Sequence, residues 1–99
     1  MNPFSLEDKL IIVTGASSGI GRQCAIDCSK MGAIVVLIAR DEERLKETIA
    51  QMEYPERHCY YSIDLSDIDQ IRLLVDNIVS ANGKIDAYVH ACLLYTSDA

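Results

Sequence analysis

Residues 14–21 read T-G-A-S-S-G-I-G, and this stretch decides the fold. An apolar run, residues 10–13, precedes it, and a segment with helical periodicity follows it. The pattern is typical of a glycine-rich turn between a strand and a helix, where the first N–H groups of the helix have no partner within the helix. Such N–H groups face outward and form a binding site for a phosphate.

The three glycines of this turn have separate steric roles. Gly15 is expected to make the turn out of the strand, because a residue without a Cβ atom adopts a positive φ at little cost. Gly19 would let a pyrophosphate approach the backbone, and Gly21 would let the first helical turn lie close to the strands, as in dinucleotide sites. The further donors expected here are the hydroxyl groups of Ser17 and Ser18 and the N–H of Ile20.

The spacing of the glycines separates this motif from others that bind phosphate. It differs from the commoner dinucleotide fingerprint G-x-G-x-x-G, and it lacks the Gly-Lys-Ser/Thr ending of a P-loop. The string T-G-A-S-S-G-I-G resembles the cofactor motif of the short-chain dehydrogenase/reductase family, in its reductase-type branch. The alternative is a glycine-rich turn that binds no ligand.

The composition indicates one small, acidic globular unit. The 99 residues carry 9 Lys and Arg against 15 Asp and Glu, a net charge of −6, and 49% are hydrophobic. Such a chain offers no cationic surface to nucleic acid or to anionic lipid, so we expect neither partner. The first ten residues contain no long apolar run, which predicts neither a signal peptide nor a membrane span.

The cysteines show neither a zinc spacing nor a C-x-x-C pair. We expect buried free thiols, no metal site and a reducing cytoplasm as the location. The four positions are Cys24, Cys28, Cys59 and Cys92.

Apolar runs that alternate with amphipathic segments predict the order β-α-β-α-β-α-β. Strands are expected over residues 9–14, 33–39 and 59–63 and from residue 86, and the first helix over residues 20–31. A second helix begins after its cap, Asp41, and stops before Pro55, and a third is expected to be capped by Ser66 and to end at residues 82–83. With right-handed crossovers, the fold class is α/β: a partial Rossmann fold with a parallel sheet of about four strands and flanking helices.

Helical spacing also predicts which side chains face the core. We expect Glu42 and Lys46 to pair on the outer face of the second helix. The expected inward positions are Ile20, Cys24, Ala25, Cys28 and Met31 in the first helix, Leu45, Ile49 and Met52 in the second, and Ile68, Ile71, Leu74, Val75 and Ile78 in the third.

Two further positions concern the nucleotide. A carboxylate at the end of the second strand would accept a hydrogen bond from the 2′-hydroxyl of NAD, but this strand ends in Ala39, and Arg40 follows. Because a guanidinium there can bind a 2′-phosphate through paired N–H donors, we expect NADP(H) in preference to NAD(H). A solvated Arg40 is the alternative, and Asp41 could weaken the preference. Asp64 and Leu65, directly after the third strand, resemble the family's Asp-hydrophobic pair that contacts adenine.

The resemblance implies an oxidoreductase that transfers hydride between NADP(H) and a carbonyl or alcohol carbon. It also implies a homo-oligomeric parent protein and a small-molecule or acyl-carrier substrate, such as a 3-oxoacyl group on a carrier protein, a sugar or a steroid alcohol. The family's general acid is a Tyr whose pKa is lowered by a Lys four residues later. No tyrosine here has that partner, so we expect no catalytic residue in these 99 residues. A non-catalytic dinucleotide-binding sensor or scaffold is the alternative function.

The resemblance covers residues 6–91 and then stops. The family continues with Asn-Ala-Gly, which lines the nicotinamide side, whereas Ala91 and Leu93 stand at the Asn and Gly positions here. Residues 92–99, C-L-L-Y-T-S-D-A, match one reading frame of a transposase mosaic-end sequencing adapter. We therefore expect residues 1–91 to be the N-terminal half of a dinucleotide-binding domain and residues 92–99 to be a non-native tail. A sheet interrupted there exposes its last strand, which predicts low thermal stability or aggregation.

Overall fold

The computed structural model describes residues 5–17 and 19–90. Its elements are β1 (Leu10–Thr14), α1 (Gly19–Lys30), β2 (Ile34–Ala39), α2 (Glu42–Ala50), the short 3-10 helix η1 (Pro55–Arg57), β3 (Cys59–Ser62), α3 (Ile68–Asn82) and β4 (Ala87–His90). The predicted order β-α-β-α-β-α-β is confirmed, and each strand begins within one residue of its predicted start. Ser18, Ala91 and the predicted tail, residues 92–99, lie outside the described residues.

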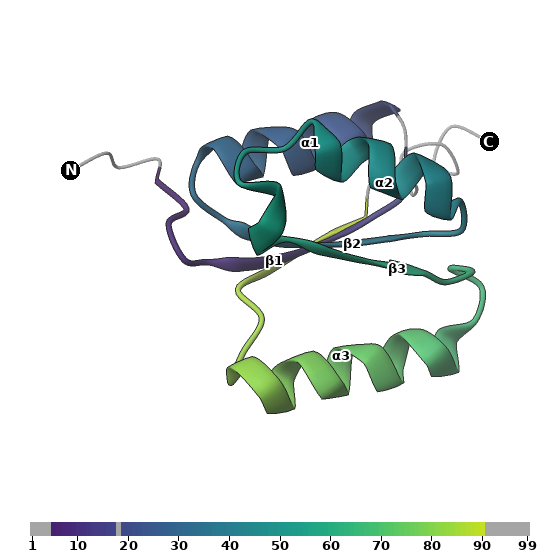
Figure 1. Ribbon diagram of the computed structural model, residues 1–99. Coiled ribbons are helices and arrows are strands. Elements are labelled where there is room, and N and C mark those ends of the chain that lie inside the picture. Colours follow the sequence, from purple (N-terminus) through teal and green to yellow (C-terminus); the bar gives the residue numbers. More distant parts are fainter. Residues whose placement is uncertain (1–4, 18, 91–99) are drawn as a thin grey trace.

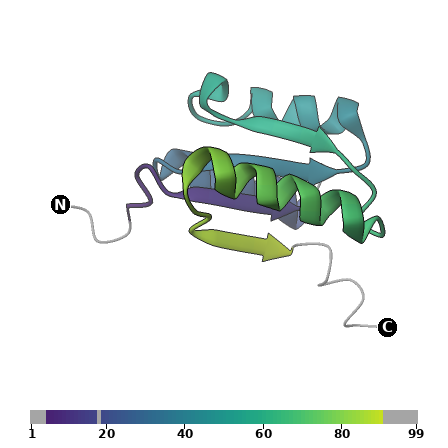
Figure 2. The same cartoon turned by 90° about the horizontal axis from the view of Figure 1, so that it is seen from below.

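The four strands form one parallel sheet in the order β3-β2-β1-β4. In Figure 1, α1 and α2 cover one face of the sheet and α3 covers the other. In Figure 2, all four strands point the same way. This arrangement confirms the predicted α/β class, a partial Rossmann fold. Strands β2 and β3 lie on one side of β1 and β4 lies on the other, so the strand order reverses at β1. Open α/β sheets bind ligands at the carboxyl ends of the strands beside such a reversal.

Strands β1 and β2 are buried because helices cover both faces of the sheet. Their side chains alternate between two layers of the core. The layer toward α1 and α2 contains Ile11, Val13, Val35 and Leu37, and the layer toward α3 contains Leu10, Ile12, Val36 and Ile38. The continuous apolar runs are therefore confirmed as central parallel strands, whereas the edge strands β3 and β4 have more exposed side chains.

Helix α1 turns a different face toward the sheet from the one that its periodicity predicts. Ile20 is 53% exposed, Met31 is 38% exposed, and the side chains of Cys24 and Cys28 are only partly buried. The buried positions are Gly21, Ala25, Ile26 and Ser29. Three of these are small residues spaced by four, and they allow the helix backbone to lie close to the strands. The prediction was therefore wrong for Ile20 and Met31, whereas Ala25 is buried as expected and Cys28 packs against the core.

Helix α2 begins at the predicted cap. The Asp41 side chain accepts a hydrogen bond from the Arg44 N–H at 3.2 Å. Of the predicted inward side chains, Leu45 and Met52 are buried and Ile49 packs against the core. The predicted pair of Glu42 and Lys46 was wrong, because Lys46 Nζ lies 3.7 Å from Glu43 Oε1, and Glu42 Oε1 accepts a hydrogen bond from Tyr60 Oη at 3.2 Å.

Helix α3 differs from its prediction at its first turn. Its N-cap is Asp67, whose side chain accepts a hydrogen bond from the Gln70 N–H at 3.1 Å, so the predicted Ser66 cap was wrong. Ile68 is 64% exposed, so its predicted inward position was wrong. Farther along the helix, Leu74 and Ile78 are buried and Val75 packs against them, as predicted.

Candidate functional site

A pocket of about 420 Å³ lies at the carboxyl ends of β1, β2 and β3. The turns after these strands supply its walls, because parallel strands end at the same edge of a sheet. The sequence-predicted residues that line it are Gly15, Ser17, Arg40, Asp64 and Leu65, together with Ala39 and Asp41. The fold thus gathers residues that are up to fifty positions apart in the sequence.

The glycine-rich turn adopts the backbone conformation that its glycines allow. Gly15 has φ 70° and Gly19 has φ 59°, both in the left-handed region that favours glycine. The Gly15 N–H donates a hydrogen bond to the Ile38 carbonyl at 2.8 Å and so attaches the turn to the end of β2. These values agree with the turning role expected for Gly15.

Gly21 allows the first turn of α1 to lie against this turn. A Cβ atom at Gly21 would lie 2.0 Å from the Gly15 carbonyl oxygen and 2.7 Å from its carbon. Helix α1 also has no acidic residue in its first turn, so no side chain there offsets the positive end of the helix dipole. The start of α1 is therefore suited to an anion. Gly19, Ile20 and Gly21 belong to this first turn rather than to the pocket wall, and Ser18 is outside the described residues.

Arg40 and Asp64 face each other in the pocket. Arg40 Nη1 lies 3.6 Å from Asp64 Oδ2, and the two side chains are 76% and 51% exposed. Asp64 Oδ1 accepts hydrogen bonds from Ser66 N at 2.9 Å and from Ser66 Oγ at 2.8 Å. These bonds, with a smaller contribution from Arg40, hold the pKa of Asp64 below its usual value. Asp64 is therefore a carboxylate at neutral pH, and the pocket contains a charged pair that the sequence pattern did not indicate.

Asp41 also lines the pocket, but its carboxylate interacts with α2. Beyond the cap bond to the Arg44 N–H, Asp41 Oδ2 lies 3.5 Å from Arg44 Nε. Both oxygens therefore have partners on the same helix. Among the described residues that line this pocket, Arg40 is the only basic one.

Two residues that no sequence pattern pointed to hold the glycine-rich turn in place. Arg22 Nη2 donates to the Ser17 carbonyl at 2.7 Å, and Arg22 Nε donates to Thr48 Oγ1 at 2.9 Å. The Thr48 hydroxyl lies 2.9 Å from the Ala16 carbonyl, to which it donates. The turn is thus attached to α2 as well as to β2.

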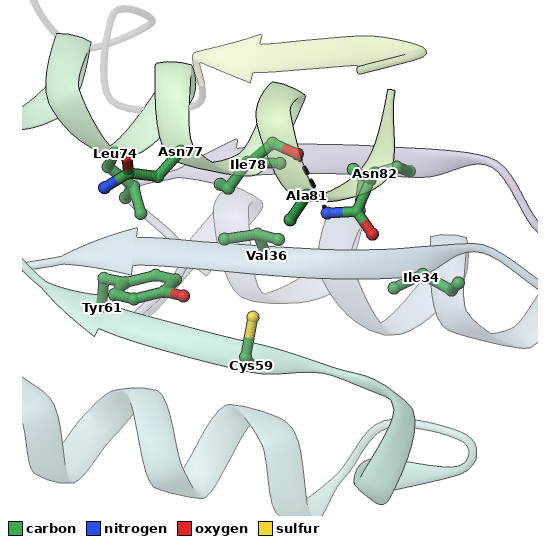
Figure 3. Close-up of a pocket in the computed structure, with 10 residues that line it drawn as sticks. Ile34, Val36, Cys59, Tyr61, Leu74, Asn77, Ile78, Ala81 and Asn82 are labelled. Carbon is green, nitrogen blue, oxygen red and sulfur yellow. Dashed lines mark hydrogen bonds between the residues drawn. The ribbon is translucent and has the colours of Figure 1, made fainter. Parts of the chain in front are cut away.

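A second pocket, of about 290 Å³, lies between α3 and the strands β2 and β3 (Figure 3). Its walls are mainly apolar, with Leu74 and Ile78 from the helix and Val36 from the sheet, and the Asn82 amide donates to the Ile78 carbonyl at 3.0 Å. None of its lining residues in the described part of the chain is a lysine or an arginine. This pocket is therefore unsuited to an anion and includes none of the predicted site residues.

The described cysteines are free, as predicted, but not fully buried. Cys24 and Cys28 are partly buried, and Cys59 is exposed at the second pocket, so the expectation of buried thiols was wrong. Burial, with the neighbouring Cys24, raises the pKa of Cys28 to about 11, so its thiol stays protonated at neutral pH. Cys92 lies outside the described residues.

The tyrosines of β3 do not have the low pKa of a phenol that donates a proton near neutral pH. Burial and a hydrogen bond to Glu42 raise the pKa of Tyr60, and Cys59, two residues earlier on the same strand, raises the pKa of Tyr61. Within residues 5–17 and 19–90, no group of three or more His, Cys, Asp or Glu side chains could hold a metal ion. None of the helices described there is long and apolar enough to span a membrane.

Comparisons with known proteins agree with this geometry. The family model described as short chain dehydrogenase matches residues 9–93. A 3beta-hydroxysteroid dehydrogenase from Mediterraneibacter gnavus is 39% identical over 85 residues, which are 85% of this chain and 31% of that protein. A short chain dehydrogenase/reductase from Aspergillus oryzae is 35% identical over 94 residues, 93% of this chain and 36% of that protein.

A solved structure gives the same result. The crystal structure of a short chain dehydrogenase from Salmonella enterica superposes with a TM-score of 0.79 at 29% identity, and the match covers 92% of this chain and 39% of that chain. The chain spans about a third of the length of the curated relatives that it matches. Because the family model covers residues 9–93, the glycine-rich turn and the end of β2 included, the chain belongs to the short-chain dehydrogenase family, whose members bind nicotinamide dinucleotides.

Proposed function

We propose that this chain is the cofactor-binding part of an oxidoreductase that transfers hydride between NADP(H) and a carbonyl or alcohol carbon. The observation that carries the proposal is the pocket at the carboxyl ends of β1, β2 and β3, which joins the glycine-rich turn to Arg40, Asp64 and Leu65. When bound, the dinucleotide would supply or accept the hydride. The residues of this chain would bind and orient it.

The residues present suit such a ligand. The close contact of Gly21 with the Gly15 carbonyl brings the start of α1 to the edge of the pocket. Gly19, Ile20 and the Ser17 hydroxyl would bind the pyrophosphate there, and the Ser18 hydroxyl is proposed from the sequence motif as a further donor. Leu65 offers an apolar surface and the Asp64 carboxylate an acceptor for the exocyclic amine of adenine. The pyrophosphate and the adenine of the nucleotide would thus each meet residues of suitable chemistry.

The preference for NADP(H) over NAD(H) rests on Arg40. Its guanidinium is largely exposed at the pocket, and Ala39 before it provides no carboxylate for a 2′-hydroxyl. Asp41 is the other candidate acceptor, but both of its oxygens interact with Arg44. A 2′-phosphate carries more negative charge than the Asp64 carboxylate and accepts paired hydrogen bonds from a guanidinium, so it can replace Asp64 as the partner of Arg40.

Isothermal titration of the 99-residue chain with NADPH and with NADH tests this preference. We expect NADPH to bind about tenfold more tightly, and Arg40→Ala to remove the difference, which corresponds to about 1.4 kcal/mol. Lys46→Ala is the matched control, because Lys46 carries the same charge on α2 but does not line the pocket. Equal affinity of the unchanged chain for the two cofactors would contradict the NADP(H) preference, and binding of neither would contradict cofactor binding itself.

The alternative function is that of a dinucleotide-binding sensor or scaffold without catalysis. It would use the same pocket, with the glycine-rich turn, Arg40 and Asp64, to bind the dinucleotide. The sequence of the source gene across codons 90–99 and the following four hundred or so bases separates the two functions. Tyr-x-x-x-Lys in that frame would support the enzyme, and a frame that ends in Y-T-S-D-A would support the binding protein and contradict the non-native tail.

The substrate, location and assembly state belong to the same proposal. A 3-oxoacyl group on a carrier protein is one candidate substrate, and a small hydroxylated or keto compound is another. Two relatives are named 3beta-hydroxysteroid dehydrogenase and 3-ketodihydrosphingosine reductase, which favours the second class. Free cysteines agree with a cytoplasmic location, and a homo-oligomer is the assembly state that we propose for the parent protein.

A further inference from the structure

We propose that Arg22 is a positioning residue for the cofactor: its guanidinium fixes the backbone of the glycine-rich turn on which the pyrophosphate would lie. This inference rests on the proposed function. Arg22 follows Gly21 in the first turn of α1 and does not line the pocket, so it would act through the turn rather than by touching the nucleotide.

The Arg22 side chain is largely buried and bonded on several sides. It is 24% exposed, and it reaches from α1 across the turn to α2. Its contacts are Nη2 to the Ser17 carbonyl at 2.7 Å, Nε to Thr48 Oγ1 at 2.9 Å, Nη2 to the Arg44 carbonyl at 3.1 Å and Nη2 to Glu47 Oε2 at 3.4 Å. Only the last involves an opposite charge, and Glu47 is 65% exposed. The shortest of these contacts, from Nη2 to the Ser17 carbonyl, is the one that holds the glycine-rich turn.

Thr48 provides the second attachment of the turn. Its side chain is fully buried, and its hydroxyl accepts from Arg22 Nε while it lies 2.9 Å from the Ala16 carbonyl and 3.1 Å from the Arg44 carbonyl. The carbonyls of Ala16 and Ser17 are thus both held on the side of the turn that faces α2.

The direction of these carbonyls determines the direction of an N–H group. The peptide group between Ala16 and Ser17 is planar and trans, so the Ser17 N–H points opposite to the Ala16 carbonyl. Because Thr48 holds that carbonyl toward α2, the Ser17 N–H is directed away from α2, and Ser17 itself lines the pocket. A turn released from Arg22 and Thr48 could rotate this peptide and lose the donor.

A guanidinium suits this position better than an ammonium group. Arg22 uses Nε and Nη2 together, in a planar fork that reaches Thr48 and Ser17 at the same time. A lysine would keep the charge but could not reproduce both directions. Arg22→Lys therefore separates the positioning effect from the effect of charge.

The test compares two ligands that share the 2′-phosphate and differ in the pyrophosphate. NADPH spans the turn and the Arg40 side of the pocket, whereas adenosine 2′-monophosphate has no phosphate for the turn. Affinities of both are measured by calorimetry for the unchanged chain and for Arg22→Lys, Thr48→Val and Thr48→Ser, after circular dichroism has shown which variants are folded. Arg57→Lys is the matched control, because Arg57 is also partly buried and paired, with Asp8 at 3.1 Å, but lies away from the turn.

We expect Arg22→Lys and Thr48→Val to weaken NADPH about tenfold relative to adenosine 2′-monophosphate, equivalent to about 1.4 kcal/mol. Thr48→Ser and Arg57→Lys should leave the ratio unchanged. A purely structural role would lower both affinities by the same factor, so an unchanged ratio in a folded Arg22→Lys or Thr48→Val protein overturns the inference. If the unchanged chain binds neither ligand, the proposed function fails, and the inference fails with it.

Discussion

Replacement of Gly21 by alanine has an effect that can be worked out from the position of one atom. The added Cβ would lie 2.0 Å from the Gly15 carbonyl oxygen, whereas real Cβ contacts essentially never fall below 3.0 Å. The start of α1 and the turn must therefore separate by about 1 Å. The obstructing atoms belong to the backbone and cannot rotate away as a side chain would.

The expected cost is about 3 kcal/mol, the upper part of the range for overpacked interiors. At an ordinary exposed position in a helix, the same substitution would stabilise the protein by up to about 1 kcal/mol, so the two cases differ in sign. A domain of this size loses roughly 4–8 °C of Tm for each kcal/mol. We therefore expect Tm to fall by about 12–24 °C, and NADPH affinity to fall with it because the start of α1 is displaced.

Thermal and urea unfolding followed by circular dichroism measure this effect. Gly83→Ala is the control, because a Cβ at Gly83 would meet nothing within 4 Å, although Gly83, unlike Gly21, has a positive φ of 88°. It should cost only the roughly 1–2 kcal/mol of a left-handed residue with a side chain. A Gly21→Ala protein as stable as the unchanged chain, or more stable than Gly83→Ala, would refute the steric argument.

Two further predictions concern stability. His58 Nδ1 accepts from the Val35 N–H at 3.0 Å, Nε2 donates to the Glu53 carbonyl at 2.8 Å, and burial lowers the pKa below 6.5. As the pH falls, His58 therefore takes up a proton at a higher pH in the unfolded chain than in the folded chain. The stability that His58 contributes should be complete above about pH 6.5 and should be lost as the pH falls toward the folded-state pKa. In urea titrations at about pH 7.5 and 5.5, His58→Gln should remove this pH dependence. Asp67→Ala should cost about 1 kcal/mol by removal of the α3 cap, and Ser66→Ala should cost less; the reverse order in urea unfolding would restore Ser66 as the cap.

The strands and the glycine-rich turn were predictable because their signals are local. Two continuous apolar runs identify β1 and β2, since only strands covered on both faces are apolar at every position. The left-handed conformations of Gly15 and Gly19 follow from the absence of a Cβ atom in a tight turn. Neither inference depends on which other part of the chain packs against the segment.

The rotation of the helices was less predictable because it depends on a partner. Apolar periodicity pointed to Ile20 and Met31 as inward positions, but the close contact between Gly21 and Gly15 turns the small residues of α1 toward the sheet. In α3, the same reasoning succeeded at Leu74 and Ile78 and was wrong at Ile68, which is exposed in the first turn of the helix. Apolar periodicity shows which side of a helix is apolar, whereas the shape of the neighbouring strands and turns decides which side packs against the sheet.

The sequence by itself determined which residues are available to a nucleotide: a turn of glycines and serines after β1, a basic residue after β2, and an acidic and an apolar residue after β3. Only the tertiary structure decided how they interact. It pairs Arg40 with Asp64, engages both oxygens of Asp41 with α2, and attaches the turn to Thr48 through Arg22. The physical reason is that such contacts join side chains from different βα turns, whose distances are set by the parallel sheet and the helices packed on it and not by spacing along the chain.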